Sequence, residues 1–431
     1  MSHGSHAKTL PADLSAPLFV NTWRRKALTV AVIFAVLGAI MAFLAATMNH
    51  DGIEHLLRSY LMGFMLCLGF CLGGMALLMT QYLTGGKWGL LLRRPLEAMS
   101  RTLPLVFGMF LPIGIAFSMK KMYLWAMYPD AWAAFKQGFI NKEQAHALAW
   151  KKPMLSVPSV WVQMLVCFAI WGVLVFLLNK WSLQRDADRE HNYASWMRKF
   201  ENVSGIGVVL YALTLTTLAI DLMMSLDITW FSTMYGLLFL VGQGYAVLAL
   251  SVITVVKLSD AEPYKTILRK IEQHDLGKLC FAFVMLNIYL AFSQFLIIWS
   301  GNQPEEIPWY LNRVRGGWGT IATLDFIFHW VIPFSLLLSR DIKRDKQRIV
   351  MVCKWMIFAR CWDMWWLIEP NFPDAARNLH WNFAQLEYFT IPVAMIALWM
   401  AFYFTQLKQR ALVPINDPHL EQILEPEHAH A

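Results

Sequence analysis

The sequence predicts an all-α, polytopic membrane protein with about ten transmembrane helices, and three observations support this prediction. Of 431 residues, 57% are hydrophobic and 15% are charged, whereas an ordinary soluble domain is about 25% charged. About ten near-continuous apolar runs follow one another, each long enough to cross a hydrocarbon core of about 30 Å. Lysine and arginine concentrate in alternate connections between these runs, which is typical of membrane topology.

The elements follow in order from the N-terminus. Residues 1–22 are polar and predict an N-terminal tail. The apolar run after the basic residues 24–26 is too long for a signal-peptide core, so we expect it to remain as the first helix. The helix bundle is expected to occupy 23–407, and the proline- and acid-bearing residues 408–431 are expected to form a disordered cytoplasmic tail. The predicted spans are 27–48, 61–83, 102–122, 157–180, 203–224, 230–256, 278–300, 319–339, 348–368 and 384–407.

The distribution of Lys and Arg predicts how the chain is oriented in the membrane. With the N-terminus inside, the short inner segments hold about 25 of the 37 Lys and Arg residues, and the outer loops hold about 10. Most of the outer ones lie in one long connection, 120–156, so both termini are expected on the cytoplasmic side. This distribution also explains the net charge of +8. No basic stretch is interleaved with a base-stacking platform, so no nucleic-acid partner is expected.

The long outer connection 120–156 alternates aromatic and basic residues. Such a pattern is typical of helices that lie flat at the membrane interface. A docking surface for an extrinsic subunit is the alternative, and the sequence does not separate the two.

Ionisable residues inside the predicted spans mark the candidate functional site. Each charge near the bilayer centre costs about 2.5–3.5 kcal/mol on insertion scales, so it requires a partner or a purpose. Asp325 and His329 are four residues apart, and Arg360 and Asp363 are three residues apart, so each pair shares one helix face. With the predicted topology the acids fall in the outer half of the membrane, which favours a shared polar pocket. The predicted proton pathway consists of Asp221, Asp325, His329, Arg360, Asp363 and Glu387.

A structural interpretation of these residues stays open. In that interpretation Arg360 pairs with a carboxylate to fix helix packing, and His329 is satisfied by Asp325. Four acids around one arginine are more than packing alone needs, which favours the functional interpretation.

Residues 274–308 form the stretch around which the rest of the chain is expected to be arranged. His274, Asp275 and Lys278 open it and predict a polar mouth on the inner side, where a solvated helix end is the plainer explanation. Ser293 and Gln294 lie inside its apolar part. They are candidates for contact with a polar-headed, lipid-soluble molecule.

No cofactor is expected on this chain itself. His329 is the only histidine well inside a predicted span, whereas an intramembrane bis-histidine haem needs two at matched depth. The six cysteines contain no C-x-x-C pair, so neither a zinc site nor an iron–sulfur cluster is predicted. Phosphate-binding and dinucleotide-binding glycine motifs are not found in the sequence either.

Two long stretches carry a family resemblance. Residues 211–244 and 276–318, the latter containing WSGNQPEEIPWY, together with the LLLSRDIKR turn at 336–344, resemble the ActF subunit of alternative complex III, a bacterial quinol:cytochrome c oxidoreductase. The likeness runs from about the second to the tenth predicted helix and is weak at both tails. The matching residues are Asp221, His274, Lys278, Ser293, Gln294, Glu305 and Glu306.

The resemblance implies a subunit of the bacterial inner membrane related to the NrfD/PsrC-type proteins, with two four-helix bundles plus two further helices. The partners it implies are an ActC-like membrane subunit, a multihaem c-type cytochrome and an iron–sulfur subunit, beside membrane lipid and a terminal oxidase. Haem c and iron–sulfur clusters then belong to those partners. The resemblance assigns proton translocation to this chain, with Ser293 and Gln294 as candidate quinone contacts.

The expected function is that of a membrane subunit of a respiratory quinol:cytochrome c oxidoreductase that offers a proton pathway and a quinone-interacting surface. A secondary transporter is an alternative, because it would also hold buried charges near the membrane midplane. Its distinguishing feature would be inverted repeats with broken helices. A purely structural scaffold would need the buried acids for assembly alone.

Overall fold

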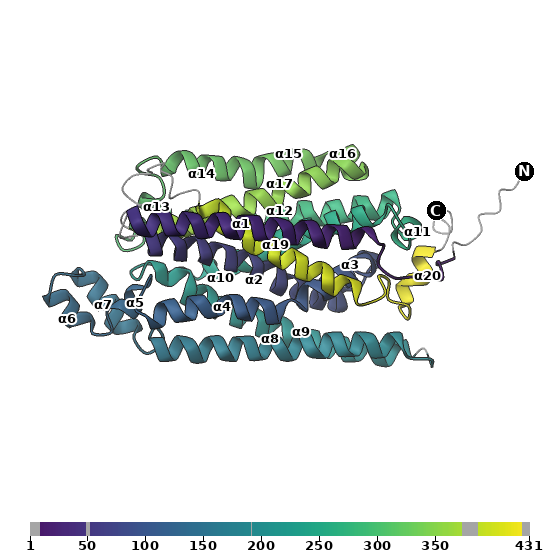
Figure 1. Cartoon of the computed structure of the whole chain (residues 1–431), viewed down its shortest axis with the longest axis horizontal. Coiled ribbons are helices and arrows are strands. Elements are labelled where there is room, and N and C mark those ends of the chain that lie inside the picture. Colours follow the sequence, from purple (N-terminus) through teal and green to yellow (C-terminus); the bar gives the residue numbers. More distant parts are fainter. Residues whose placement is uncertain (1–8, 49–51, 191, 373–386, 425–431) are drawn as a thin grey trace, which may run out of the picture.

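The computed structural model describes residues 9–48, 52–190, 192–372 and 387–424, which form an elongated bundle of helices joined by loops (Figure 1). Among the described residues, eight helices are long and apolar enough to cross a membrane, or up to nine if the bent pair α3 (Lys87–Ser100) and α4 (Leu103–Ser118) is one span. The first and last described residues lie at one end of the bundle, here called the terminal end. The helices α5, α6 and α7 lie at the opposite end, here called the distal end.

The helices vary widely in length. The long ones are α1 (Phe19–Met48), α2 (Gly52–Thr84), α4 (Leu103–Ser118), α8 (Val157–Asp186), α9 (Tyr193–Leu222), α10 (Met234–Leu258), α12 (Lys270–Gly301), α17 (Lys346–Ile368) and α19 (Glu387–Lys408). The shorter ones are α3 (Lys87–Ser100), α5 (Leu124–Met127), α6 (Ala131–Lys136), α7 (Lys142–Lys151), α11 (Tyr264–Ile267), α13 (Ile307–Asn312), α14 (Trp318–Phe326), α15 (Ile332–Leu338), α16 (Arg340–Arg344) and α20 (Pro418–Leu424).

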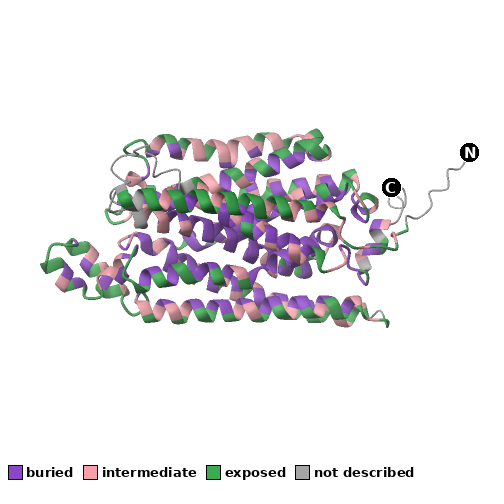
Figure 2. Cartoon of the chain, viewed as in Figure 1, coloured by how far each residue is buried: buried purple, intermediate pink, exposed green. Residues whose placement is uncertain are grey.

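The centre of the bundle consists of α2 and α10, whose apolar segments are almost wholly enclosed (Figure 2). Glycine allows them to approach closely, because a Cβ atom at Gly73 would lie 2.8 Å from Val247. The peripheral helices instead turn large apolar side chains outward, for example Phe43 on α1 and Leu213 on α9. An apolar exterior around an enclosed core is what a lipid environment requires.

The expected span 348–368 corresponds to α17. Its 23 residues give a length of about 34 Å at about 1.5 Å per residue. It is not among the described helices that are apolar enough to cross a membrane, because it carries Arg360, Asp363 and three basic residues nearer its start. Helix α17 packs against α10 and α14, so its charges face protein as well as the exterior.

Most of the charged residues between the predicted spans 61–83 and 102–122 lie in a buried helix and not, as expected, in a short inner segment. Residues 87–100 form α3, in which every side chain from Gly89 to Ser100 is buried. This helix packs against α2, α10, α19 and α20 and then bends by 41° into α4. Hydropathy misses such a segment because its charges are neutralised by ion pairs with distant parts of the chain.

The expectation of a disordered C-terminal tail is also wrong for residues 409–424. Leu412 donates a backbone hydrogen bond to the carbonyl of Leu14 at 2.8 Å, and four apolar side chains of the segment are buried: Leu412, Val413, Leu420 and Ile423. Their burial offsets the entropy of ordering the segment. The segment therefore closes the terminal end of the bundle.

The connection 120–156 forms the three short helices α5, α6 and α7, which project from the distal end (Figure 1). Asn141 and Gln144 form a capping box at the start of α7, which fixes where that helix begins. Lys151 anchors the connection by donating to the carbonyls of Ile228 and Trp230. The connection is thus helical, which both interpretations of this stretch allow.

Protonation of Asp417 is expected to release the C-terminal segment. Asp417 pairs with Arg93 and Arg185. Burial raises the pKa of Asp417, but the two guanidinium groups outweigh burial and hold the pKa below its ordinary value of 3.8. Such a carboxylate stabilises the folded form above about pH 4, and that contribution is lost as the pH falls through the folded-state pKa.

Asp417→Asn removes this charge at neutral pH, so we expect residues 409–424 to become accessible to protease at pH 7 in the variant. In the natural chain the same cleavage should appear only in acid, with an acid-active protease. Glu421→Gln, which removes an exposed acid from the same segment, is the control. Equal protection of residues 409–424 in the Asp417 variant and the natural chain at pH 7 would contradict the prediction.

Candidate functional site

Two neighbouring helical segments position most of the predicted pathway residues. One is the span Trp318–Leu338, in which α14 and α15 are joined by a π-helical turn over Ile327–Val331. The other is α17, which lies beside it (Figure 1). Turns of this type frequently occur at functional sites. Here the turn contains His329, and Asp325 precedes it by one helical turn.

Asp325, His329, Arg360 and Asp363 form one group, here called the α14–α17 cluster. One ligand atom from each of Asp325, His329 and Asp363 lies within 4.8 Å of the other two. Arg360 donates to the Asp363 carboxylate, so these two charges neutralise each other. Asp325 Oδ1 and His329 Nε2 are enclosed and have no hydrogen-bond partner among the described residues. The cluster is therefore a complete ion pair beside an incomplete carboxylate–imidazole pair.

Helix α10 forms the wall of the cluster. A Cβ atom at Gly242 would lie 2.6 Å from Cζ of Arg360, so glycine leaves the room that the guanidinium occupies. Phe239 presents its ring centroid 5.7 Å from the same atom, within cation–π range. Tyr245 packs edge-to-face against the His329 ring at 4.6 Å and donates to the His329 carbonyl at 3.3 Å. These three residues of α10 fix where the charged groups lie.

Sequence reasoning did not identify the three α10 residues. Phe239, Gly242 and Tyr245 recur at intervals of three, which places them on one helix face. That spacing is the signal available in the sequence. An aromatic and glycine stripe at such spacing is common in helix packing, and only the position of α17 shows what it faces.

Asp221 does not join the α14–α17 cluster. It lies at the end of α9, on the side of the bundle opposite α14 (Figure 1). Both of its carboxylate oxygens are enclosed without a hydrogen-bond partner among the described residues. Tyr123 lies nearby and donates to the carbonyl of the next residue, Leu222, at 2.9 Å. Asp221 is therefore a separate buried acid.

The positions of three of the four acids test the expectation that these acids lie at one depth in the membrane. Asp221, Asp325 and Asp363 each lie within about two turns of the distal end of their helix. Glu387 begins α19, and its side chain lies outside the described residues. The three acids thus share one half of the bundle but occupy two sites.

The predicted inner mouth is a helix start near solvent. Asp275 and Lys278 form an exposed ion pair of 2.9 Å in the first turns of α12, which contributes little free energy. His274 is half-buried beside them, and its Nδ1 atom is enclosed without a partner among the described residues. Nothing in this geometry joins the three residues to the α14–α17 cluster at the other end.

The two candidate quinone contacts are engaged within the protein. Ser293 donates to the Tyr289 carbonyl of its own helix at 2.7 Å. Gln294 is buried, accepts from Ser232 at 3.1 Å and donates to the Tyr310 hydroxyl at 3.3 Å. Gln294 therefore joins α12 to its neighbours at the distal end.

The same three ligand atoms of the α14–α17 cluster lie close enough to bind a metal ion. Arg360 already occupies the Asp363 carboxylate, which leaves Asp325 and His329 as free ligands. Zinc sites use three or four protein ligands. A cation would have to displace the guanidinium, so the arrangement suits proton exchange better than metal binding.

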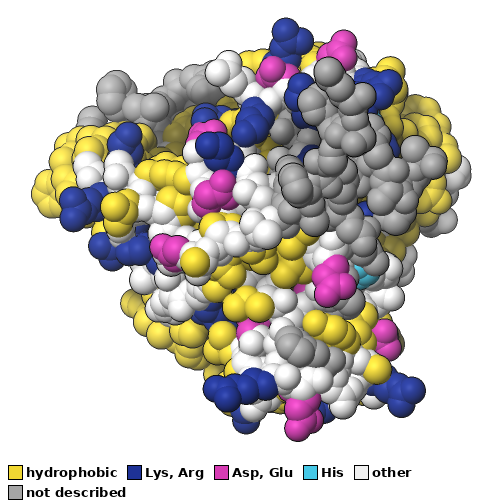
Figure 3. All heavy atoms as spheres, turned by 90° about the vertical axis from the view of Figure 1, so that its right-hand side faces the viewer, with side chains coloured by type: hydrophobic (Ala, Val, Ile, Leu, Met, Phe, Trp, Pro, Cys, Tyr) yellow, Lys and Arg dark blue, Asp and Glu magenta, His cyan; other side chains and the backbone are white. Residues whose placement is uncertain are grey.

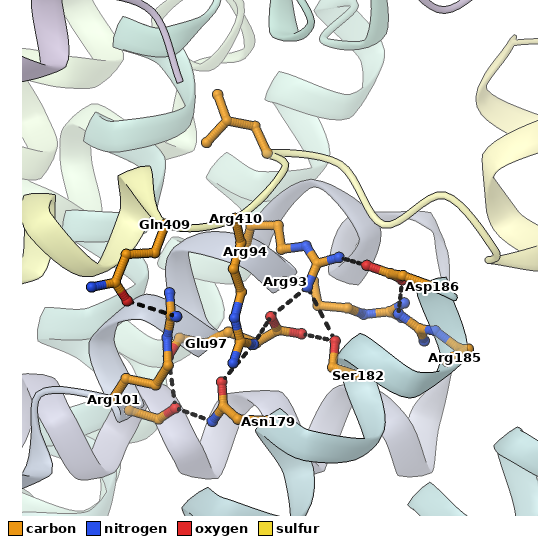
Figure 4. A network of polar contacts seen from close by, with 12 residues as sticks. Arg93, Arg94, Glu97, Arg101, Asn179, Ser182, Arg185, Asp186, Gln409 and Arg410 are labelled. Atoms are coloured by element: carbon orange, nitrogen blue, oxygen red, sulfur yellow. Dashed lines mark hydrogen bonds and ion pairs between the residues drawn. The ribbon is translucent and has the colours of Figure 1, made fainter. Parts of the chain in front are cut away.

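A second group of buried charges, which sequence reasoning missed, lies at the terminal end (Figure 4). Glu97 is fully buried and accepts from Arg94 at 2.7 Å, from Arg410 at 3.1 Å and from Ser182 at 2.5 Å. Arg94 also pairs with Asp186. We call the whole group the terminal network; its charged members are Arg93, Arg94, Glu97, Arg185, Asp186, Arg410 and Asp417.

The three-residue spacing of Arg94 and Glu97 was the available signal for this network. The other pairs join residues that lie far apart in the sequence, such as Arg93 and Asp417, and no local pattern marks them. Three elements, α3, α8 and the C-terminal segment, are held together by these pairs.

Comparison with known proteins does not identify the chain. No protein-family model matches the sequence, and no curated protein matches it.

Proposed function

We propose that this chain is an integral membrane subunit of a respiratory quinol:cytochrome c oxidoreductase, and that its α14–α17 cluster holds a proton in transit. The observation that carries the proton-holding role is the pair of enclosed, unpartnered atoms, Asp325 Oδ1 and His329 Nε2, beside a completed ion pair. The respiratory assignment rests on the resemblance of 211–244 and 276–318 to the ActF subunit. The division into two four-helix bundles plus two helices belongs to the same proposal.

Charge balance supports a proton at this site. Arg360 and Asp363 compensate each other, so Asp325 and His329 must be neutral as a pair. One proton satisfies that condition in two ways. It can sit on the Asp325 carboxyl beside a neutral imidazole, or on His329 beside the Asp325 carboxylate. An isolated buried charge costs several kcal/mol, and both arrangements avoid it.

The same balance explains how the proton would move. Transfer between Asp325 and His329 leaves the net charge of the cluster unchanged, so the low-dielectric surroundings oppose it weakly. Asp363 lies within 4.8 Å of both ligand atoms and provides a third accepting position when Arg360 moves away. Quinol oxidation in a neighbouring subunit would supply the protons. The electrons would pass through haem c and iron–sulfur clusters of the partner subunits.

Asp325→Asn tests the proposal because it keeps the side-chain shape and removes the exchangeable proton. In the intact complex reconstituted in vesicles, we expect proton-coupled turnover to fall by about two orders of magnitude, the usual weight of one acid–base group. Co-purification of c-type haem subunits with the variant shows that assembly is retained. Asp275→Asn, which removes a solvent-facing acid of α12, is the matched control and should leave turnover unchanged.

Two results would each overturn one part of the proposal. An unchanged proton-to-electron ratio in an assembled Asp325→Asn complex would remove the proton role. Purification of the natural chain without any haem-bearing partner would remove the respiratory assignment.

A secondary transporter is the second candidate, and one observation favours it. The segment α3–α4 is broken by a 41° bend, with Pro104 in the first turn of α4. Broken helices often border substrate sites in transporters. Substrate uptake by vesicles that contain the purified chain alone would support this alternative.

A further inference from the structure

An open pocket of about 360 Å³ lies at the terminal end of the bundle. It is bordered by three residues of the N-terminal segment and by the end of α19 with the chain that follows. Its lining residues are Ala12, Leu14, Ser15, Lys408, Gln409, Arg410, Ala411 and Ile415. Small-ligand sites usually measure about 300–1,000 Å³. The pocket is thus large enough for a phosphate group together with part of the molecule that carries it.

Positive charge exceeds negative charge around this pocket. Each acid of the terminal network is shared by two guanidinium groups, and Glu97 in particular binds both Arg94 and Arg410. Arg101 adds a further guanidinium with no carboxylate within 4 Å among the described residues. Counting Arg93, Arg94, Arg101, Arg185 and Arg410 against Glu97, Asp186 and Asp417, five positive groups face three negative ones. Lys408 in the wall offsets Asp13, whose neighbours Ala12 and Leu14 line the pocket.

Two cations without a carboxylate partner lie at or behind the pocket wall. Arg101 lies behind the wall residue Gln409, to which it donates at 3.4 Å, and it also donates to the Gln406 carbonyl. Its Nε atom is enclosed without a hydrogen-bond partner among the described residues. Lys408 lies in the wall and donates to the Asn21 amide oxygen rather than to an acid. An anion in the pocket would therefore compensate charges that the described protein leaves uncompensated.

The position of the pocket indicates which class of anion it would bind. It lies where α19 ends and where α1, which packs along α19, begins. The first turns of α1 carry three more basic residues at 24–26. Lys and Arg side chains lie on this end together with Asp, Glu and apolar side chains (Figure 3). Basic pockets at the ends of membrane helices commonly bind anionic lipid headgroups.

We propose that this pocket binds a phosphate group, with Arg101, Lys408 and Arg410 as its ligands and an anionic phospholipid as its source. Ile415, which is half exposed, and Leu14 give the pocket an apolar wall beside the charged one. A glycerophospholipid presents the same pairing of a phosphodiester and an apolar body. Free phosphate shares only the first of these features.

Titration of the purified full-length chain in detergent with short-chain phosphatidylglycerol tests the proposal. Binding is followed by the shift in thermal unfolding and by native mass spectrometry, with phosphatidylcholine and inorganic phosphate as parallel probes. We expect phosphatidylglycerol to bind best. Arg101→Gln and Lys408→Gln should each weaken it about fivefold, the usual weight of one basic residue at a membrane surface. Arg101→Lys should retain most of the affinity.

Lys257→Gln is the matched control, because Lys257 is an exposed lysine of α10 at the same end. Equal binding of phosphatidylglycerol by the natural chain and by the double variant Arg101→Gln/Lys408→Gln would overturn the proposal, as would equal stabilisation by phosphatidylcholine. Inorganic phosphate that stabilises the chain as well as phosphatidylglycerol does would overturn the lipid as source. None of these results depends on turnover, so they are independent of the proton role of the α14–α17 cluster.

Discussion

Replacing Glu97 by glutamine is expected to destabilise the folded chain by about 3–5 kcal/mol, the usual cost of breaking a buried ion pair by removing one partner. Glu97 is fully buried and accepts from two guanidinium groups and one hydroxyl. Glutamine keeps the shape and the carbonyl acceptor for Ser182. It leaves Arg410 without its acid and Arg94 with Asp186 alone.

Thermal unfolding of the purified chain, followed by tryptophan fluorescence, measures this effect. Asp275→Asn is the control, because it removes the acid of an exposed ion pair and should cost less than about 1 kcal/mol. Similar unfolding temperatures for the two variants would show that the terminal network contributes no more than surface charges do. A large difference would show that α3, α8 and the C-terminal segment are held together by electrostatics.

Replacing Arg360 by methionine is expected to be about as costly, roughly 3–5 kcal/mol. The change leaves Asp363 charged in an enclosed site beside Asp325. The double variant Arg360→Met/Asp363→Leu removes both charges and replaces them by apolar groups of similar volume. Such double replacements are commonly neutral or stabilising, so we expect stability to return to within about 1 kcal/mol of the natural chain.

This cycle separates the two interpretations of the α14–α17 cluster. A purely structural ion pair predicts that the double variant recovers assembly and proton-coupled turnover together. The proton-holding role predicts that it recovers assembly but only part of turnover, because Asp325 and His329 remain while the third accepting position, Asp363, is lost. Full recovery of turnover in a stable double variant would therefore favour the scaffold alternative.

The two buried charge groups have different physical requirements. In the terminal network every acid is shared between cations, so its members are fixed and its excess charge is positive. In the α14–α17 cluster the ion pair is complete, and the remaining carboxylate and imidazole share a place for one exchangeable proton. The first arrangement is suited to holding segments together and binding an anion. The second is suited to exchanging a proton without changing the net charge.

The sequence by itself determined the helical class and the pairing of residues along each helix. Long apolar runs are sufficient to predict membrane-length helices, because the bilayer core fixes the length that must be apolar. The helical period placed Asp325 with His329 and Arg360 with Asp363 on common faces. Both results depend on local periodicity, which the order of residues contains directly.

Only the tertiary structure decided which faces meet. The packing of α14 beside α17 joined two pairs into one cluster, while α9 carried Asp221 to the opposite side of the bundle. Arg93 and Asp417, which are 324 residues apart, turned an apparently polar connection and an apparently loose tail into buried structure. Hydropathy counts each charge as if it were alone, whereas the free energy of a buried charge depends on a partner that only the folded chain supplies.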